Sequence, residues 1–363
     1  MKNAAQTFGI LTSGGDCPGL NAAIRAVAKA AYGIYGMNVM GIYNGYKGLI
    51  DGEVRPLESA DVSGILTRGG TILGTSREKP FKASKDSEKP EGINKVEAIK
   101  EAYSRYNLDC IVVLGGNGSQ KTASLLKQEG LNVIGLPKTI DNDIYGTDIT
   151  FGFHSAVDIA TEAIDRLHST AHSHNRVMVI EVMGHDAGWL ALYSGFAGGG
   201  DIIIIPEIPY DIESIRKHLV KRAKGGKAFS IVVVAEGAIS VEEAKLSKEE
   251  LKKKRKNDKS PSRGYAIARE IEAITDMDVR VSVLGYQQRG GSPSPYDRVI
   301  ATQFGTAAVE LLHEGSFGNM VAKVNNEIIP VPLEEVAGKL KLVPKDHRVI
   351  RDARMVGTCF GDD

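Results

Sequence analysis

Residues 8–36, FGILTSGGDCPGLNAAIRAVAKAAYGIYG, contain the pattern that decides the fold. A short apolar run, FGILT, passes through a glycine-rich turn into a long stretch of helical character. A buried strand that leads through a turn into a helix is the repeating unit of α/β proteins, in which helices cover a parallel sheet. The stretch therefore predicts an α/β fold whose first strand ends in a glycine loop.

The same alternation continues along the chain. Short runs rich in β-branched residues recur, and segments of helical character, such as residues 155–174, separate them. Uninterrupted apolar runs are typical of parallel strands that are covered on both faces. Because 363 residues fit two domains comfortably, we expect two doubly wound α/β units in tandem. The further runs are NVMGIY (38–43), DCIVVLGG (109–116), NVIGLP (132–137), RVMVIEV (176–182), DIIIIPE (201–207), FSIVVVAEG (229–237) and VRVSVLG (279–285).

The composition is that of an ordinary globular protein. Charged residues make up 25% of the chain, hydrophobic residues make up 42%, and the formal net charge is zero. A neutral chain has no general attraction for nucleic acid or for an anionic membrane, so any anion site must be built locally. Three cysteines make no disulfide framework, and no apolar run approaches the roughly 20 residues of a membrane span. We expect a cytoplasmic protein that binds neither nucleic acid nor membrane.

One segment, KLSKEELKKKRKNDKSPSR (245–263), is strongly basic. Nucleic-acid binding is one interpretation of such a run. The segment has no aromatic residues to stack on bases, and its charge is not continued elsewhere in the sequence. We therefore interpret it as a solvated helix and loop inserted between a strand and the following helix.

Glycine-rich or charged motifs stand where six of the predicted strands end. Ligands of open α/β sheets bind beyond the carboxyl ends of the strands. Six such ends predict one large polar site, or two facing edges around a cleft. The motifs are SGGDCPGLN (13–21), GGNGSQ (115–120), PKTIDND (137–143), EVMGHDAG (181–188), EG (236–237) and GYQQRGG (285–291).

Two of these motifs, SGGD (13–16) and GGNGS (115–119), suit phosphate. Glycines let backbone N–H groups approach phosphate oxygens, and the following helix N-terminus adds a favourable dipole. Neither motif matches GxGxxG or the P-loop, so the simple dinucleotide and P-loop interpretations do not fit. Arginines beside glycine or at strand and loop ends suit bidentate phosphate binding. They are Arg77, Arg166, Arg176, Arg280 and Arg289.

The motif PKTIDND places Asp141 and Asp143 just past a predicted strand. An ordinary polar turn would use the same residue types. Phosphoryl transfer, which the glycine loops and arginines favour, needs a group that accepts the proton of the attacking hydroxyl, and usually Mg²⁺ held by a carboxylate. One of the two acids is therefore a candidate base for a sugar hydroxyl.

The chain also carries seven longer motifs: LTSGGDCPGLNAAIR (11–25), GGTILGTSR (69–77), GGNGSQ (115–120), PKTIDNDIYGTD (137–148), AIDRLHSTAHSHNR (163–176), EVMGHDAG (181–188) and VLGYQQRGGSPSPYDR (283–298). In this order and spacing they resemble the 6-phosphofructokinase family, from about residue 6 to residue 325. The resemblance implies phosphoryl transfer to the 1-hydroxyl of fructose 6-phosphate, a step of glycolysis, with Mg²⁺ as cofactor. It also implies self-association as a homotetramer or homodimer with shared active sites.

Two α/β domains that face each other across an active-site cleft are part of the resemblance. The larger domain, residues 1–150 plus about 290–335, is expected to bind the phosphoryl donor. The smaller domain, residues 151–289 plus about 336–363, is expected to bind fructose 6-phosphate.

Individual roles follow from the resemblance, position by position. The expected catalytic residues are Asp141 as general base, Thr139 beside it, and Arg77, which bridges the transferring and leaving groups. The expected donor-binding residues are Gly14, Arg77, Gly116, Asn117, Gly118, Ser119 and Lys138. The expected sugar-phosphate residues are Thr139, Ile140, Asp141, Arg176, Met183, Gly184, His185, Glu236, Arg280, Tyr286, Gln287, Gln288 and Arg289. Asn117 and Asp143 are the expected Mg²⁺ ligands, and Arg176 and Arg280 are expected to reach the sugar phosphate across a subunit interface.

Three positions depart from the common bacterial pattern of the family. Asn117 replaces an acid, so we expect weaker metal binding at this position or greater reliance on Asp143. His185 replaces an arginine, and Tyr286 replaces a histidine, although tyrosine can still donate a hydrogen bond to phosphate.

The phosphoryl donor depends on two positions that point in different directions. Gly118 leaves room for a nucleotide, whereas an acid there would crowd and repel the α-phosphate region and favour pyrophosphate. Lys138 is typical of pyrophosphate users. We expect ATP, with pyrophosphate as the alternative; a kinase of another sugar phosphate and a non-catalytic sugar-phosphate sensor are further alternatives.

Overall fold

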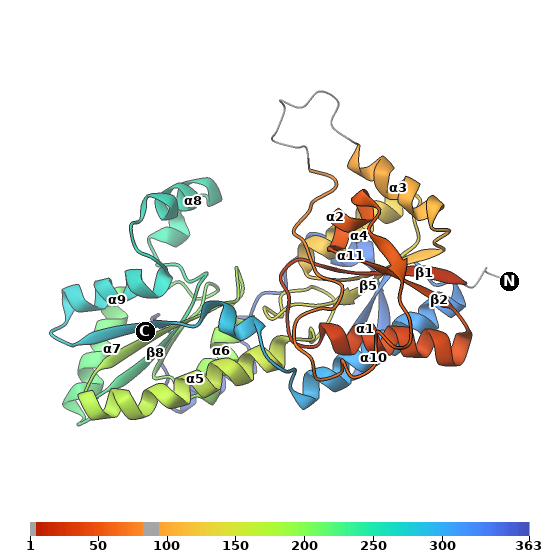
Figure 1. Ribbon diagram of the computed structural model, residues 1–363. Coiled ribbons are helices and arrows are strands. Elements are labelled where there is room, and N and C mark those ends of the chain that lie inside the picture. Colours follow the sequence, from red (N-terminus) through yellow and green to blue (C-terminus); the bar gives the residue numbers. More distant parts are fainter. Residues whose placement is uncertain (1–4, 83–93, 363) are drawn as a thin grey trace. The chain divides into compact units, whose positions relative to one another are not determined.

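A computed structural model describes residues 5–82 and 94–362, which form two compact units (Figure 1). Unit 1 comprises residues 1–155 and 289–341, and unit 2 comprises residues 156–288 and 342–363. Each unit has its own sheet with helices packed against it, which confirms the predicted α/β class. The assignment of one ligand to each unit stays a prediction.

The sheet of unit 1 has seven strands in the order β11-β10-β5-β4-β1-β2-β3. The five strands from β10 to β2 are parallel, and β11 and β3 pair antiparallel at the two edges. The strands are β1 (Thr7–Ser13), β2 (Asn38–Ile42), β3 (Val54–Pro56), β4 (Cys110–Gly115), β5 (Val133–Pro137), β10 (Asn319–Val324) and β11 (Glu327–Pro332).

The two antiparallel edges have a local cause. β11 follows β10 after only Asn325 and Asn326, whose φ angles are +51° and +69°. Asparagine adopts this left-handed region readily, and two such residues form the tight turn that suits a hairpin. β3 likewise follows β2 through the seven-residue helix α2 (Gly45–Asp51). Connections this short leave no room for the crossover that parallel strands require.

Helices cover both faces of the unit 1 sheet (Figure 1). α1 and α10 pack on each other on one face, and α2, α3, α4 and α11 contribute to a core cluster with β1, β4 and β5 on the other. The remaining helices are α1 (Leu20–Ala30), a π-helical turn (Ala31–Tyr35), α3 (Lys95–Arg105), α4 (Asn117–Gln128), α10 (Pro295–Glu314) and α11 (Leu333–Val336).

Unit 2 contains a four-stranded parallel sheet in the order β7-β8-β6-β9. Its core cluster joins α7 and α9 to Val177, Ile202 and Val232, whereas Gly195 of α6 approaches the alternate residues Ile203 and Val233. Because neighbouring strand residues point to opposite faces, the sheet is covered on both sides. The elements are α5 (Phe153–His174, which begins in unit 1), β6 (Val177–Val182), α6 (Trp189–Ala197), β7 (Ile202–Ile204), α7 (Ile212–Lys224), β8 (Ser230–Ala235), the 3₁₀ turn Glu243–Lys245, α8 (Lys248–Asn257), α9 (Arg263–Ile274), β9 (Val279–Val283), the 3₁₀ turn Gly285–Arg289 and α12 (Arg348–Met355).

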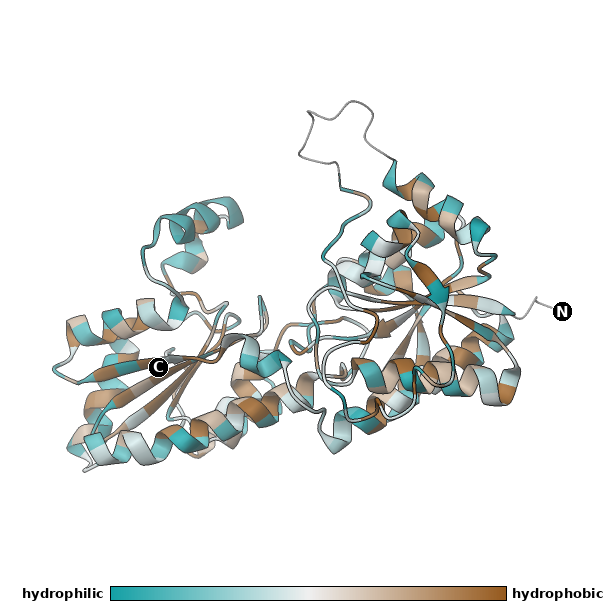
Figure 2. Ribbon diagram, viewed as in Figure 1, coloured by the Kyte–Doolittle hydropathy of each residue, from teal (hydrophilic) through white to brown (hydrophobic). Residues whose placement is uncertain are grey.

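The basic segment forms α8, which has no buried residue and appears hydrophilic along its length (Figure 2). A capping box starts it, because Ser247 accepts the Glu250 N–H while the Glu250 carboxylate accepts the Ser247 N–H. Residues 248–257 thus form a solvated helix, as expected, whereas Arg263 at the end of the basic segment begins α9 and pairs with the buried Glu243 carboxylate (2.5 Å). Within the described residues, no helix combines the length and the apolar character needed to cross a bilayer.

Candidate active site

The ends of three adjacent strands bring three of the predicted loops together in unit 1. β5, β4 and β1 are neighbours, and their last residues Pro137, Gly115 and Ser13 lie in register. The Ser119 hydroxyl donates to the Ser13 hydroxyl (3.0 Å), and the Lys138 N–H donates to the Gly115 carbonyl (3.1 Å). The loops SGGD, GGNGS and PKTIDND therefore form one continuous polar edge.

The GGNGS loop is the N-terminus of α4. Gly116 is the N-cap residue, and the first turn contains no acid that would compete for an anion. A Cβ atom built on Gly118 would have no heavy atom within 4 Å, so the space beside this residue is open. The first N–H groups of a helix lack intrahelical partners and stand at the positive end of its dipole. The geometry suits a phosphate group.

The SGGD loop (13–16) is hydrogen-bonded to residues 74–76, GTS, which lie about 60 positions further along the chain. Gly14 has a φ of +86°, a conformation that glycine adopts without strain. Its N–H donates to the Ser76 carbonyl (2.9 Å), and the Thr75 hydroxyl donates to the Gly14 carbonyl (2.7 Å). Because Arg77 directly follows Ser76, these bonds fix the backbone next to Arg77 against the glycine loop.

Arg77 lines a cavity of about 550 Å³ that is rich in lysine. One carboxylate lines it as well, and that carboxylate, Glu78, pairs with Lys95 (2.8 Å). The excess positive charge suits a polyanion. Of the residues that line this cavity, the sequence predicted only Arg77 as a site residue. The lysines of the run REKPFK (77–82), which begins with Arg77, were the available signal for a basic site. The lining residues are Lys47, Ser76, Arg77, Glu78, Lys79, Lys82 and Lys95.

The TIDND loop is fixed by hydrogen bonds around Asp141. The Asp141 N–H donates to the Thr139 hydroxyl (3.0 Å), and the Thr150 hydroxyl donates to the Thr139 carbonyl (2.7 Å). Asn142 has a φ of +51°, and its side-chain oxygen accepts the Thr150 N–H (3.1 Å). The Ile140 side chain is fully buried beneath the loop. One carboxylate oxygen of Asp141, Oδ1, is buried without a hydrogen-bond partner among the described residues, an arrangement that native proteins keep mainly at functional groups.

Two cationic side chains donate hydrogen bonds to backbone carbonyls of the SGGD loop. The buried Lys138 ammonium donates to the Gly15 carbonyl, and Arg289 Nη1 donates to the Asp16 carbonyl (3.1 Å). Burial lowers the pKa of the Lys138 ammonium, and the Arg289 charge acts in the same direction. Arg289 therefore lies beside the loops expected to bind the donor, and both cations offer positive charge to an anion held there.

The two expected magnesium ligands also lie in unit 1. Asp143 is buried, and the Asn117 amide nitrogen donates to the Lys339 carbonyl, which leaves the Asn117 amide oxygen for a cation. Within the described part of the chain, no cluster of three or more His, Cys, Asp or Glu residues could hold a metal by itself. Mg²⁺ usually takes one or two carboxylates and completes its shell with water and substrate phosphates. The oxygens present fit such a partial site.

Unit 2 gathers a second group of the predicted residues at the carboxyl end of its sheet. Met183, Gly184 and His185 follow β6, and the His185 N–H donates to the Glu236 carboxylate (2.8 Å) after β8. The Met183 N–H donates to the Gln288 side chain (3.3 Å). Tyr286 and Gln287, in the same 3₁₀ turn as Gln288, are exposed. These hydrogen bonds bring Met183, Gly184, His185, Glu236 and Gln288 together at one end of the sheet.

Arg176 and Arg280 lie at the opposite end of that sheet. Arg176 precedes β6, Arg280 is the second residue of β9, and both pair with Asp278. Met183 follows the last residue of the six-residue strand β6, so the strand separates it from Arg176 by about 20 Å. Within one chain, the structure therefore does not bring these arginines to the Met183 group, that is, Met183, Gly184, His185 and Glu236.

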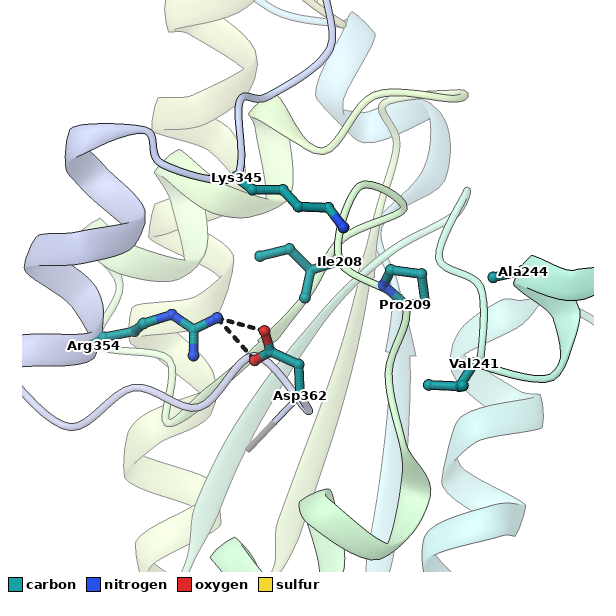
Figure 3. A pocket seen from close by; sticks show the side chains of 7 residues that line it. All are labelled: Ile208, Pro209, Val241, Ala244, Lys345, Arg354 and Asp362. Atoms are coloured by element: carbon teal, nitrogen blue, oxygen red, sulfur yellow. Dashed lines mark hydrogen bonds and ion pairs between the residues drawn. The ribbon is translucent and has the colours of Figure 1, made fainter.

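A cavity of about 340 Å³ in unit 2 is lined by none of the predicted site residues (Figure 3). The Arg354 side chain pairs with the Asp362 carboxylate on one side of it (2.7 Å), and Lys345 extends towards Pro209. The remaining lining residues are Ile208, Val241 and Ala244.

Proteins of known family and structure resemble this chain over nearly its whole length. Residues 7–312 match the family described as Phosphofructokinase. A protein of Spirochaeta thermophila named ATP-dependent 6-phosphofructokinase is 69% identical over 364 residues, which cover 99% of each chain. ATP-dependent 6-phosphofructokinase 3 of Bacteroides thetaiotaomicron is 53% identical over 98% of this chain and 99% of its own length.

Solved structures show the same similarity. Pichia pastoris phosphofructokinase in the T-state superposes with a TM-score of 0.78 at 34% identity, over 92% of this chain and 35% of that longer chain. A pyrophosphate-dependent phosphofructokinase from Marinobacter aquaeolei gives a TM-score of 0.78 at 25% identity, over 98% and 92% of the two chains. The family match and the full-length relatives lead to one conclusion: the chain belongs to the phosphofructokinase family.

Proposed function

We propose that the protein is an ATP-dependent 6-phosphofructokinase, which transfers the γ-phosphoryl group of ATP to the 1-hydroxyl of fructose 6-phosphate. One structural observation carries the proposal. A carboxylate oxygen of Asp141 lies buried and without a partner among the described residues, at an edge formed by two glycine loops that suit phosphate. Full-length relatives named ATP-dependent enzymes support ATP as the donor.

The donor phosphates bind at the glycine loops. Backbone N–H groups in the GGNGS loop, at the start of α4, hold phosphate oxygens at the positive end of the helix. Gly14, whose own N–H is bonded to the Ser76 carbonyl, has no side chain and so lets the phosphates approach this loop. Arg77 and the lysines of the adjacent cavity neutralise the remaining negative charge. Gly118 leaves open space for the nucleotide, which supports ATP over the smaller pyrophosphate.

Asp141 acts as the general base. It accepts the proton of the sugar's 1-hydroxyl while that oxygen bonds to the γ-phosphorus and the bond between this phosphorus and the leaving ADP oxygen breaks. Thr139 orients the loop, because its hydroxyl accepts the Asp141 N–H. The hydrogen bond between the Asn142 side chain and the Thr150 N–H fixes the loop that carries the carboxylate before substrate arrives, which lowers the entropic cost of reaching the reactive geometry.

Asp143 and the Asn117 amide oxygen are the residues that would hold Mg²⁺. The ion, when bound with the donor phosphates, supplies positive charge that stabilises the transferring group. Because Asn117 carries no charge, Asp143 provides the main protein contribution to this site.

The sugar phosphate is held by residues of unit 2, completed by a second copy of the chain. Met183, Gly184, His185 and Glu236 form one group, and Arg176 and Arg280 lie at the far end of the same sheet. An isologous interface can place the arginines of one copy beside the Met183 group of another. We therefore propose a homodimer or homotetramer with shared active sites.

Mixing two inactive variants tests the shared site. Asp141→Asn lacks the base, and the double variant Arg176→Ala/Arg280→Ala lacks the arginines. In hybrid dimers with shared sites, one of the two sites regains both groups, so random mixing after dissociation should restore roughly a quarter of wild-type activity. Hybrids that form, as shown by differently tagged chains, yet stay inactive would rule out sharing.

Lys138→Met tests the pyrophosphate-type lysine. The substitution keeps the aliphatic stem and removes a buried ammonium bonded to the Gly15 carbonyl. Loss of a charge-assisted contact to a small donor should lower any pyrophosphate turnover by about 10- to 100-fold, with a smaller effect on ATP turnover. Initial rates with both donors check this. An unchanged ratio of the two rates would show that Lys138 does not influence donor choice.

The experiment that tests the function is product analysis. Purified protein with Mg²⁺, ATP and fructose 6-phosphate should yield fructose 1,6-bisphosphate, identified by its two phosphorus resonances. Sedoheptulose 7-phosphate should react much more slowly. A reversed preference would indicate a kinase of that sugar phosphate. Sugar-phosphate binding without turnover would indicate a sensor instead.

A further inference from the structure

We propose that residues 339–341, just before the chain enters unit 2, form a brace that holds the catalytic loop TIDND (139–143) in its conformation. Lys341 is the positioning residue of this brace. This inference rests on the proposed function for its kinetic consequence. Its structural part depends on contacts within unit 1 alone.

Lys341 binds the residue between the two acids of the catalytic loop. Its ammonium donates to the Asn142 side-chain oxygen and to the carbonyls of Thr147 and Asp148, each at 2.9 Å. The same Asn142 oxygen accepts the Thr150 N–H. A single side-chain oxygen therefore ties the left-handed residue of the loop both to Thr150 and to the brace.

The backbone of the brace pairs with the loop as well. The Lys341 N–H donates to the Asp143 carbonyl (2.9 Å), and Leu340 forms an antiparallel bridge with Ile144. One residue earlier, the Lys339 carbonyl accepts the Asn117 side-chain amide from the GGNGS loop. Three consecutive residues thus connect the loop that carries the base to the loop expected to bind the donor.

The position of Lys341 is unusual for a lysine. Its side chain is only partly exposed, and burial lowers the pKa of the ammonium to about 8, although Asp148 and Asp143 act in the opposite direction. Withdrawing an ammonium from water costs free energy unless acceptors replace the water. Three oxygens do so here, and all of them belong to the segment from Asn142 to Asp148. The interaction therefore constrains this segment specifically.

The contacts also explain the use of asparagine at position 117. An aspartate would lack the N–H donor and would place a negative charge against the Lys339 carbonyl. The amide instead donates to the brace through its nitrogen and keeps its oxygen for a cation.

Lys341→Met tests the brace, because it keeps the chain length and removes the three donors. Lys345→Met, which removes an exposed ammonium four residues later, is the matched control. We expect kcat of Lys341→Met to fall by about tenfold or more, with the KM for fructose 6-phosphate changed less than about threefold, since a small misplacement of a reacting group mainly affects turnover. The control should match the wild type.

Hydrogen exchange supplies a readout that needs no substrate. In Lys341→Met, amides of residues 139–151 should exchange faster, while peptides from α1 and α10 keep wild-type protection. If Lys341→Met does not fold, Lys341→Gln, which retains an amide donor, replaces it, and exchange in residues 139–151 is again compared with exchange in α1 and α10. Unchanged exchange in 139–151, or faster exchange throughout unit 1, would overturn the positioning role. A wild-type protein inactive on fructose 6-phosphate would refute the proposed function and leave the exchange result to decide the brace.

Discussion

Asp141→Asn should lower turnover by about a thousandfold, the middle of the range for losing a general base. Asparagine has nearly the same shape but cannot accept the proton of the 1-hydroxyl. The Asp141 N–H bond to Thr139 involves the backbone, so the loop should keep its conformation. The KM for fructose 6-phosphate should change little, because the lost interaction belongs to the transition state.

Steady-state rates at saturating ATP and Mg²⁺ measure the effect. Asp61→Asn, which changes an exposed aspartate of the same unit whose side chain accepts the Glu58 N–H, is the control and should retain wild-type turnover. If Asp141→Asn kept more than about a tenth of wild-type kcat, the base would have to be another group.

Gly118→Asp should raise the KM for ATP by one to two orders of magnitude without destabilising the fold. No heavy atom lies within 4 Å of a Cβ placed there, so the added Cβ makes no clash in the free protein. An acid in the first turn of α4 is favourable with respect to the helix dipole. The same carboxylate would face the phosphates of the nucleotide, and like charges a few ångströms apart repel by about 1–4 kcal/mol in partly aqueous surroundings.

The control for this variant is Gly118→Ala, which adds a side chain without charge. Both variants should unfold at or above the wild-type temperature, because glycine is a poor helix former. ATP binding should weaken strongly only in Gly118→Asp. Equal losses in both variants would point to crowding instead of charge, and no loss in either would place the nucleotide elsewhere.

The sequence predicted the elements with strong local signals. Uninterrupted apolar runs marked β1, β4 and β5, and because parallel strands end at the same edge, their loops could be expected to meet. The edge strands β3 and β11, and β10 next to β11, were missed. Asn325 and Asn326 between two apolar runs were the available signal for the β10–β11 hairpin.

Other parts of the site depend on contacts that no local pattern encodes. Lys341 lies about 200 positions from Asn142, in a stretch that looks like an ordinary polar segment. Arg289 stays a predicted sugar-phosphate residue, and its hydrogen bond to the Asp16 carbonyl is a contact that the sequence did not indicate. Such long-range relations follow from tertiary packing, which neither propensity nor motif spacing determines.

The central claim is that this site transfers phosphoryl groups from ATP to fructose 6-phosphate. The most direct test is to measure kcat/KM for ATP and for pyrophosphate in parallel, at the same fructose 6-phosphate and Mg²⁺ concentrations, by following fructose 1,6-bisphosphate. We expect a kcat/KM for ATP that exceeds the value for pyrophosphate by about a hundredfold or more, because the open space at Gly118 admits the nucleotide and gives it extra binding energy. A higher value for pyrophosphate would contradict it and would make Lys138 the residue that decides the donor.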